Sequence, residues 1–428
     1  MSVSSTPFEQ TRAEQLTRGG AFGDPERLAA WGRFVVDGLP APRAERWKYT
    51  PVAKLLDRPF EPAPRVDARD LPLPPPLPGA TRLVFVNGHF EPGRSDALAP
   101  VPGRSSARLA VVPSVPSLPP AAAKGPAGEP GVWALNRALF EQATLVEIPA
   151  GVDGGKVELL HLMTGVPDGA MAHPRAFFRL EAGARLTVVE RFVGHSETAY
   201  FVDAVTDAEL GEGATLVHSV VQSEGTKALH LGTLRIHQGA KSHLESHLLQ
   251  LGAQLSRREV SVHFAGEGAE ASLDGLFVSG GRQHHDQQVE LEHAQPGCVS
   301  RQRFRGLVSG HARGVFTGRV HVHPDAQKTD AEQSARVLLL SPDAEADLRP
   351  HLEIHADDVK ATHGATVGEL DPEQLFYLRT RGIPEATARE LLTTAFAREV
   401  LDALPEPVLR EQALAELERR AATGKEGA

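Results

Sequence analysis

A repeated pair of small residues is the feature that most constrains how this chain folds. The pair recurs at Gly183-Ala184, Gly213-Ala214, Gly239-Ala240 and Gly268-Ala269, at spacings of 30, 26 and 29 residues. Each pair is followed by alternating polar and apolar residues, which is the pattern of strands with one buried face. A unit of this size cannot bury its own apolar face, so it has to stack on its neighbours.

The repeat predicts the fold class. We expect residues 145–355 to form a right-handed parallel β-helix, or β-solenoid, in a mainly β protein with helical domains at both ends. A β-sandwich is the alternative that these observations leave open, because strand spacing does not by itself fix the topology.

The N-terminal third divides into two expected regions. Residues 1–60 are predicted to be helical, with a capping box at Thr6-Pro7-Phe8-Glu9 and a second helix that opens at Asp24-Pro25. Residues 61–144 are rich in proline, which favours extended linkers or mobile loops. Within them, Leu83–Val86 is expected to be a strand of a small subdomain.

Residues 356–428 are predicted to form a C-terminal helical domain. Asp371 can cap a helix whose first position is Pro372. An apolar stripe follows at helical spacing, made of Leu391, Leu392, Ala395, Phe396 and Leu404. Such stripes usually pack against a core, although a helical cap on a solenoid can also offer one face to a partner.

Charge and hydropathy exclude several classes of protein. The formal net charge of −10 argues against broad binding of nucleic acid. Arg301, Arg303 and Arg305 are expected to lie on an ordinary solvated strand face. The first residues have no apolar core of a signal peptide, and no later run approaches the roughly 18 apolar residues of a membrane span. We therefore expect a cytoplasmic protein.

The single cysteine, Cys298, limits the chemistry further. One thiol excludes intramolecular disulfides and CxxC sites, and an iron–sulfur cluster usually takes about four thiolates. The chain also lacks GxSxG and the phosphate-binding GxxxxGK[ST]. We expect that it holds no cluster alone and that Cys298→Ser is tolerated, because nothing nearby in the sequence activates this thiol.

Several of the 19 histidines are placed so that they could bind a metal ion together. His321 and His323 share one strand face, as do His243 and His247, and His284-His285-Asp286 falls in a polar turn. However, no HExxH is present, and spacing ties no further carboxylate to these pairs. A structural role is the more common one for such histidines.

One more histidine, His363, lies beside Gly364 and directly after a polar run. The stretches Arg336–His355 and Ala356–Ile383 closely resemble the C-terminal region of the SufB/SufD family, the scaffold proteins of iron–sulfur cluster assembly. Where the SufB type reads HEAT, this chain reads His363-Gly364-Ala365-Thr366. It also has Ala335 where SufB has a functional cysteine, so the resemblance is to the SufD type. Ala361 replaces a cysteine that many SufD sequences have.

The resemblance implies a function and two partners. It implies a scaffold, not an enzyme, that pairs with a SufB-like subunit through the β-helix and binds the SufC ATPase through the C-terminal helices. Leu391, Leu392 and Phe396 are the expected ATPase-binding residues. His363 is expected at the SufB interface, as an iron ligand or proton relay for a nascent cluster shared with SufB. Flavin binding stays undecided.

A shorter match lies near the N-terminus, where Glu45–Thr50 resembles a SufD-type motif. The chemistry of Trp47 and Tyr49 predicts a packing anchor. The residues themselves leave open two alternative functions from other classes of protein. One is a metal-dependent or carbohydrate-active β-helix enzyme that uses the histidine pairs, and the other is a homo-oligomeric structural protein.

Overall fold

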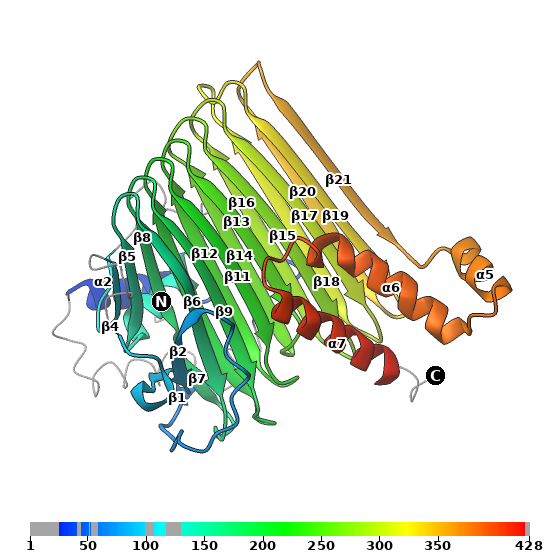
Figure 1. The fold of residues 1–428 in the computed structure, drawn as a ribbon, viewed down its shortest axis with the longest axis horizontal. Coiled ribbons are helices and arrows are strands. Elements are labelled where there is room, and N and C mark those ends of the chain that lie inside the picture. The colour runs from blue at the N-terminus through cyan, green and yellow to red at the C-terminus, as the bar shows by residue number, and fades with distance from the viewer. Residues whose placement is uncertain are drawn as a thin grey trace, which may run out of the picture.

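The computed structural model describes residues 25–40, 44–50, 52, 59–98, 107–116 and 130–423. The predicted capping box at Thr6-Pro7-Phe8-Glu9 lies outside these residues, as do positions 99–106 and 117–129 of the expected proline-rich region. The chain forms a β-solenoid whose successive strands alternate between two sheets, with helices at both ends (Figure 1). The predicted mainly β solenoid is therefore confirmed.

In the described part of the chain, sheet A contains eleven strands, and nine of them form its main path. In spatial order these nine are β20 (Glu345–Ile354), β18 (Arg313–Val322), β16 (His284–His293), β14 (Leu255–Phe264), β12 (Leu229–Gln238), β10 (Tyr200–Leu210), β8 (Arg175–Leu180), β5 (Ala143–Ile148) and β4 (Arg108–Val112). Off this path, β1 (Glu61–Pro62) pairs with β7 (Ala170–Ala172), which pairs with β10.

Sheet B contains ten strands. In spatial order they are β21 (Lys360–Gly368), β19 (Asp330–Leu339), β17 (Val299–Val308), β15 (Glu270–Ser279), β13 (His243–Gln250), β11 (Thr215–Ser223), β9 (Arg185–Gly194), β6 (Asp153–Met163), β2 (Ala80–Val86) and β3 (His89–Phe90). Neighbouring strands are parallel from β5 to β20 and from β2 to β21. This continuous parallel stacking rules out the β-sandwich.

The repeated corner is a residue in the left-handed backbone region followed by a small buried residue. Gly183, Gly213 and Gly268 have φ values of 67°, 64° and 67°, and the alanine after each is fully buried. The pair at Gly239-Ala240 is out of register by two residues, because Lys241 takes the left-handed position there, with φ of 54°. Glycine is the usual residue at this position because it has no Cβ to clash, but the turn tolerates lysine.

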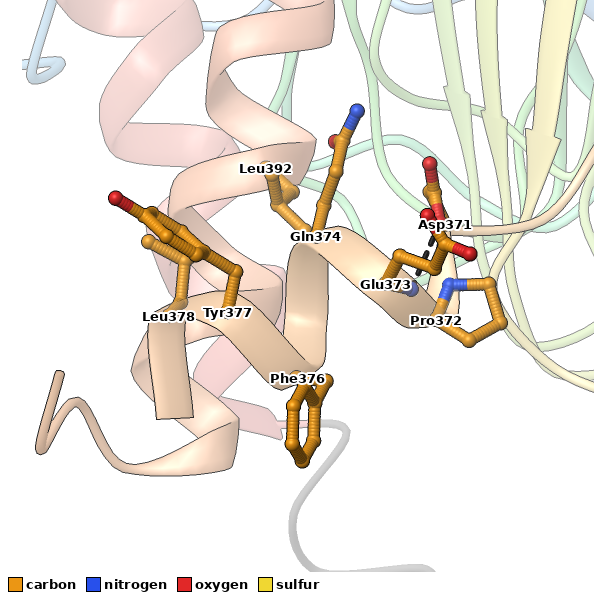
Figure 2. Close-up of a pocket in the computed structure, with 8 residues that line it drawn as sticks. All are labelled: Asp371, Pro372, Glu373, Gln374, Phe376, Tyr377, Leu378 and Leu392. Atoms are coloured by element: carbon orange, nitrogen blue, oxygen red, sulfur yellow. Dashed lines mark hydrogen bonds between the residues drawn. The ribbon is translucent and has the colours of Figure 1, made fainter. Parts of the chain in front are cut away.

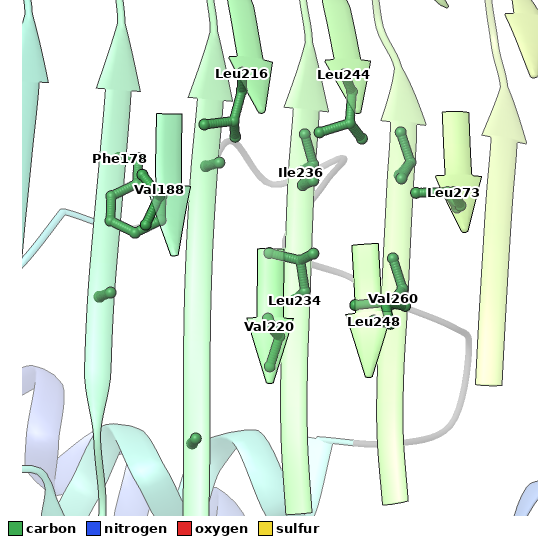
Figure 3. Packing of buried hydrophobic residues seen from close by; sticks show 14 of the residues in the cluster. Phe178, Val188, Leu216, Val220, Leu234, Ile236, Leu244, Leu248, Val260 and Leu273 are labelled. Carbon is green, nitrogen blue, oxygen red and sulfur yellow. The ribbon is translucent and has the colours of Figure 1, made fainter. Parts of the chain in front are cut away.

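The core lies between the two sheets, where inward-facing aliphatic side chains stack turn upon turn (Figure 3). On sheet B, Leu216 of β11 is paired with Leu244 of β13. On sheet A, Leu234 of β12 is paired with Val260 of β14. All four are at most 2% exposed. Burying each such side chain contributes roughly 1.5–3 kcal/mol, so every turn depends on the turns beside it.

The described residues of the N-terminal third include two helices and two short 3₁₀ turns: α2 (Pro25–Asp37), η2 (Glu45–Trp47), η4 (Pro92–Arg94) and α4 (Pro130–Leu139). The α2 helix begins where the sequence predicts it. Trp47 is 2% exposed, and the guanidinium of Arg257 on sheet A lies 3.8 Å from its ring centre. Tyr49 is half-buried beside Arg313 and Arg349. The predicted packing anchor is therefore confirmed.

The proline-rich segment after residue 60 is ordered against the solenoid. Ala68 and Leu77 are buried, so the segment is neither a linker nor a mobile loop. The predicted strand is β2, which turns through Asn87 and Gly88, both with positive φ, into β3. Because β2 pairs in parallel with β6, it extends sheet B and does not belong to a subdomain of its own.

The solenoid also extends beyond the expected boundary at residue 355. Residues 360–368 form β21, which pairs in parallel with β19, although a helical domain was expected from residue 356. Most side chains of β21 are exposed, so burial does not impose the alternation of apolar and polar residues by which a strand is recognised in a sequence. The hydrogen bonds of β21 to β19 hold this strand in place.

Three helices follow β21: α5 (Pro372–Thr380), α6 (Glu385–Leu401) and α7 (Pro407–Thr423). Asp371 caps α5 as predicted, since its carboxylate accepts a hydrogen bond from the Glu373 N–H. Buried residues of α6 and α7 pack with outward-facing residues of sheet B, and both helices lie across that sheet in Figure 1. None of the described helices combines the length and apolar character needed to cross a bilayer.

Candidate functional site

The solenoid ends at β20 and β21, which are the last strands of their sheets. Each has an edge on which no described strand pairs. The Lys360 N–H donates to Thr329 O, next to β19. Because N–H groups alternate between the two sides of a strand, those of residues 361, 363, 365 and 367 face the open edge. This end therefore presents backbone donors and acceptors to a further strand.

His363 lies on this last strand and faces the solenoid axis. Its register partner on β19 is Gln333, whose own partner on β17 is Gln302. Both glutamines are 1% exposed, and the Gln333 amide donates to Gln302 Oε1 at 3.0 Å. Paired residues of stacked strands point the same way, so His363 continues this inward polar row. No further turn covers it, and it is exposed.

A glycine on the opposite sheet leaves space for the Gln333 side chain of this row. A Cβ at Gly318 of β18 would lie 2.0 Å from the Gln333 amide nitrogen. Glycine at this position lets the Gln333 side chain cross between the sheets. His363 is thus an imidazole in water at the mouth of a buried polar row, which is a suitable place for a metal ligand or a proton carrier.

The two alanines of the family comparison lie close to His363 in the fold. Ala361 precedes it by two residues on the same face of β21, and it is half-buried against the core. Ala335 lies one strand inward on β19, paired with Ala365, and is 1% exposed. Neither position supplies a thiol here, so among these three positions only His363 has a side chain of a kind that can bind a metal.

A second accessible feature is the apolar surface of α5. Phe376 and Tyr377 are 68% and 58% exposed, and they flank an open pocket of about 950 Å³ that also includes Leu392 (Figure 2). In α6, Leu391 is 49% exposed. Large apolar side chains grouped in this way mark a contact surface. Phe376 and Tyr377 were not predicted as contact residues from the sequence.

The three residues expected to bind the ATPase separate into two groups. Leu391 and Leu392 lie at or near the α5 pocket. Phe396 packs instead with the cluster between α6 and sheet B, and the guanidinium of Arg305 lies 5.9 Å from its ring centre. Phe396 therefore helps to attach α6 to the solenoid.

The histidine pairs have different surroundings. His284 is hydrogen-bonded to Thr50, while His285 points inward to Gly252 O. His247 is buried, and burial lowers its pKa to about 4. His321 and His323 do share one outer face, and their ring centres are 4.4 Å apart. Stacking also brings Glu292 beside them.

Glu292 was not predicted from the sequence as a neighbour of His321, because it lies one solenoid turn earlier in the chain. The signal was available in the repeat, since residues 263, 292 and 321 follow one another at the spacing of one turn. Pairing of β14, β16 and β18 aligns these three residues in register.

Cys298 is a structural corner residue. It follows Gly297, which has φ of 69°, and it takes the place that Ala184, Ala214 and Ala269 take in other turns. It is fully buried, and burial raises the pKa of its thiol. An inaccessible thiol of raised pKa is a poor nucleophile and a poor metal ligand.

The expected arginine stripe is paired with carboxylates. Arg301 lies 2.9 Å from Asp330, and Arg303 lies 2.7 Å from Asp274. Arg305 contacts Glu399 of α6 at 2.7 Å. These side chains therefore join neighbouring strands or fix α6, and they do not form a free basic surface.

Comparison with known proteins assigns this arrangement to a family. Residues 162–396 match the family described as SUF system FeS cluster assembly, SufBD core domain. The chain belongs to the SufB/SufD family. It is 33% identical to the iron–sulfur cluster assembly protein SufD of Escherichia coli K12 over 94% of each chain, which supports the SufD type.

Two further relatives carry the same family name. An iron–sulfur cluster assembly SufBD family protein of Synechocystis is 32% identical, over 86% of this chain and 84% of its own length. One from Mycobacterium tuberculosis is also 32% identical, over 65% of this chain and 71% of its own length. The matched region 162–396 covers the solenoid from the end of β6 through β21 and reaches into α6, so it includes His363.

Proposed function

We propose that this chain is a scaffold subunit of the SUF machinery that pairs with a SufB-type subunit, binds a SufC-type ATPase, and helps a nascent iron–sulfur cluster form at the interface with SufB. The observation that carries the proposal is the exposed, inward-facing His363 at the open end of the solenoid. Family membership supports the pathway in this proposal, and the exposure of His363 at the open end supports the site.

The open end supports pairing with a SufB-type solenoid. The outward N–H and C=O groups of β21 can bond to a strand of a partner, as in β-augmentation. Val367 on β21 and Ile354 on β20 are 43% and 40% exposed, which adds apolar area around the unpaired edges. A partner bound here would bring its own residues next to His363.

The α5 surface supports binding of a SufC-type ATPase. Phe376 and Tyr377 are exposed at the α5 pocket, and Leu391 is exposed next in sequence to Leu392, which lines that pocket. They lie on the helices after β21, and α5 stands beyond the body of the solenoid in Figure 1. Aromatic side chains at the centre of a contact often carry much of its binding energy.

In this proposal the chain contributes one ligand to the cluster. A cluster held by about four ligands would take imidazole from His363 and its other ligands from elsewhere. With Cys298 buried in a corner, this chain has no accessible cysteine to supply a second ligand.

Co-expression with a SufB-type and a SufC-type subunit tests the proposal. We expect a complex that contains all three chains and, after anaerobic reconstitution, iron and sulfide in proportion to the complex. The isolated chain should hold no stoichiometric iron–sulfur cluster, measured as acid-labile sulfide, and hydrolyse no ATP. Failure to associate with either subunit, or ATP turnover by the isolated chain, would contradict the proposal.

A further inference from the structure

Outward-facing polar side chains form a continuous column across the last turns of sheet A. His263 on β14 is paired with Glu292 on β16, and Glu292 with His321 on β18. The next strand places Glu353 beside His321. Stacked strands are about 4.8 Å apart, so successive side chains of this column can contact one another. The column lies on the outer face of sheet A, whereas His363 faces inward from sheet B.

His323, just beyond β18, completes a group of three possible metal ligands. One ligand atom from each of Glu292, His321 and His323 lies within 4.8 Å of the other two. The distance between His323 Nε2 and Glu292 Oε1 is 2.9 Å. Ligand atoms roughly 2.1 Å from a tetrahedral ion lie about 3.4 Å apart. Small side-chain rotations would therefore bring the three atoms around one ion.

The remaining oxygen of Glu292 has a partner that fixes its orientation. His263 Nδ1 lies 2.9 Å from Glu292 Oε2, and the His263 side chain is 12% exposed. A ligand held by a buried hydrogen-bonding neighbour is typical of protein metal sites. His263 is thus a positioning residue in this arrangement.

We propose that Glu292, His321 and His323 bind one divalent transition-metal ion of the Fe²⁺, Co²⁺ and Zn²⁺ class. Two imidazole nitrogens and one carboxylate oxygen are typical ligands for these ions, with water in the remaining positions. The ion takes the place of the hydrogen between His323 Nε2 and Glu292 Oε1, and the His323 ring then carries its proton on Nδ1. The three ligands are half-buried on an outer face, so the ion can enter directly from solvent.

A neighbouring group on the same strands is a weaker candidate. His321, Glu353 and His355 also have ligand atoms within 4.8 Å of one another. However, Arg319 donates to Glu353 at 2.5 Å, and its guanidinium already neutralises that carboxylate. By contrast, the hydrogen-bond partners recorded for Glu292 among the described residues are imidazoles. The carboxylate of the first group, Glu292, is therefore the better metal ligand, because no arginine among its described hydrogen-bond partners neutralises it.

Cobalt titration of the isolated, metal-stripped chain tests the site. We expect one equivalent of Co²⁺ to bind with the visible absorption of low-coordinate Co²⁺, and Zn²⁺ to displace it. Replacing both imidazoles in His321→Ala/His323→Ala should remove this absorption. Glu292→Gln keeps the side-chain shape and should weaken binding at least tenfold. His263→Ala should weaken it by about 10–100-fold with the stoichiometry kept.

His243→Ala is the matched control, because His243 lies 3.3 Å from Glu270 in an outer-face pair on sheet B with no third ligand recorded among the described residues. This variant should bind Co²⁺ as the parent chain does. Circular dichroism and the melting temperature establish that each variant is folded. Unchanged affinity and absorption in both Glu292→Gln and the double variant would overturn the proposal, as would equal loss of binding in His243→Ala.

Discussion

At the scale of single residues, His363 occupies the position where a stacked column ends. Gln302 and Gln333 bury their amides inside the solenoid, but the next side chain in the row meets solvent. Its exposure makes a role in packing unimportant for stability. An exposed imidazole that faces an unpaired end is instead available to whatever binds there.

We expect His363→Ala to lower the iron and sulfide content of the assembled three-subunit complex several-fold, because the change removes a ligand or proton carrier. The free energy of unfolding should change by no more than about 0.5 kcal/mol, as for other exposed side chains. His351→Ala, an exposed histidine on β20, is the matched control. Normal iron and sulfide in a variant complex of normal composition would remove His363 from the mechanism.

For Cys298 we expect the opposite result, which is a loss of stability without a loss of cluster content. Cys298→Ser and Cys298→Ala should each cost on the order of 1 kcal/mol of stability, because they alter a small buried corner residue. The hydroxyl of the serine variant can donate to Gly266 O as the thiol does now. Iron and sulfide per folded complex should stay unchanged. A collapse of cluster content in complexes that still form would show that the thiol takes part in assembly.

At the scale of elements, α5 differs from the two helices that follow it. Deleting α6 and α7 would expose the outer face of sheet B, including Val221, Leu249 and Leu276. Truncation after Asp371 would therefore disturb the solenoid as well as the contact surface. The exposed residues of α5 can be changed without that side effect.

The double substitution Phe376→Ser/Tyr377→Ser should weaken SufC binding by roughly 2 kcal/mol or more, as for aromatic residues at the centre of an interface. Titration calorimetry or co-purification measures the loss. Val36→Ser is the control, since Val36 on α2 is 83% exposed, and α2 and α5 lie on opposite sides of the view in Figure 1. If the ATPase binds the double variant with full affinity, its contact surface lies elsewhere.

The last strand allows a separate test of SufB pairing. The N–H of Ala365 faces the open edge, so Ala365→Pro removes a donor that β19 does not use. Proline is tolerated at such edge positions, and Gly364 before it imposes little steric restriction. We expect loss of the SufB-type subunit with SufC binding retained, measured by the composition of the purified complex. Retention of both partners would show that β21 is not the pairing strand.

At the scale of the whole molecule, the solenoid buries several histidines in their neutral form. Burial lowers the pKa of His161, His247 and His284 from 6.5 to about 4, and that of His293 to about 3. Between these values and pH 6.5, the unfolded chain binds protons that the folded chain does not. The contribution of these groups to the free energy of unfolding is therefore fully present above pH 6.5 and is lost as the pH decreases toward 4.

We expect the urea midpoint to fall steeply between pH 6.5 and 4.5, by an amount equivalent to several kcal/mol in the free energy of unfolding. His293→Gln should flatten this dependence by removing about one of the protons taken up on unfolding, even if the variant is less stable at neutral pH. The exposed His351→Gln should leave the slope unchanged. Equal slopes for the parent chain and His293→Gln would contradict a neutral buried His293.

The sequence by itself determined the parts of the fold that depend on local or strictly periodic physics. Left-handed corners need glycine or a tolerant substitute, and one buried strand face needs alternation, so the solenoid follows from the repeat. The start of α5 follows from Asp371 and Pro372 in the same way. The resemblance around His363 also identified the family correctly.

Tertiary structure decided whatever depends on contacts between turns. The segment 360–368 is a strand because β19 offers it a ladder, not because its side chains alternate. Phe396 faces sheet B and Leu391 faces solvent, although both belong to one predicted stripe. Glu292 meets His321 only through stacking at a distance of 29 residues in sequence. Such contacts depend on register, and a one-residue shift of a strand would turn each of these side chains to the other face.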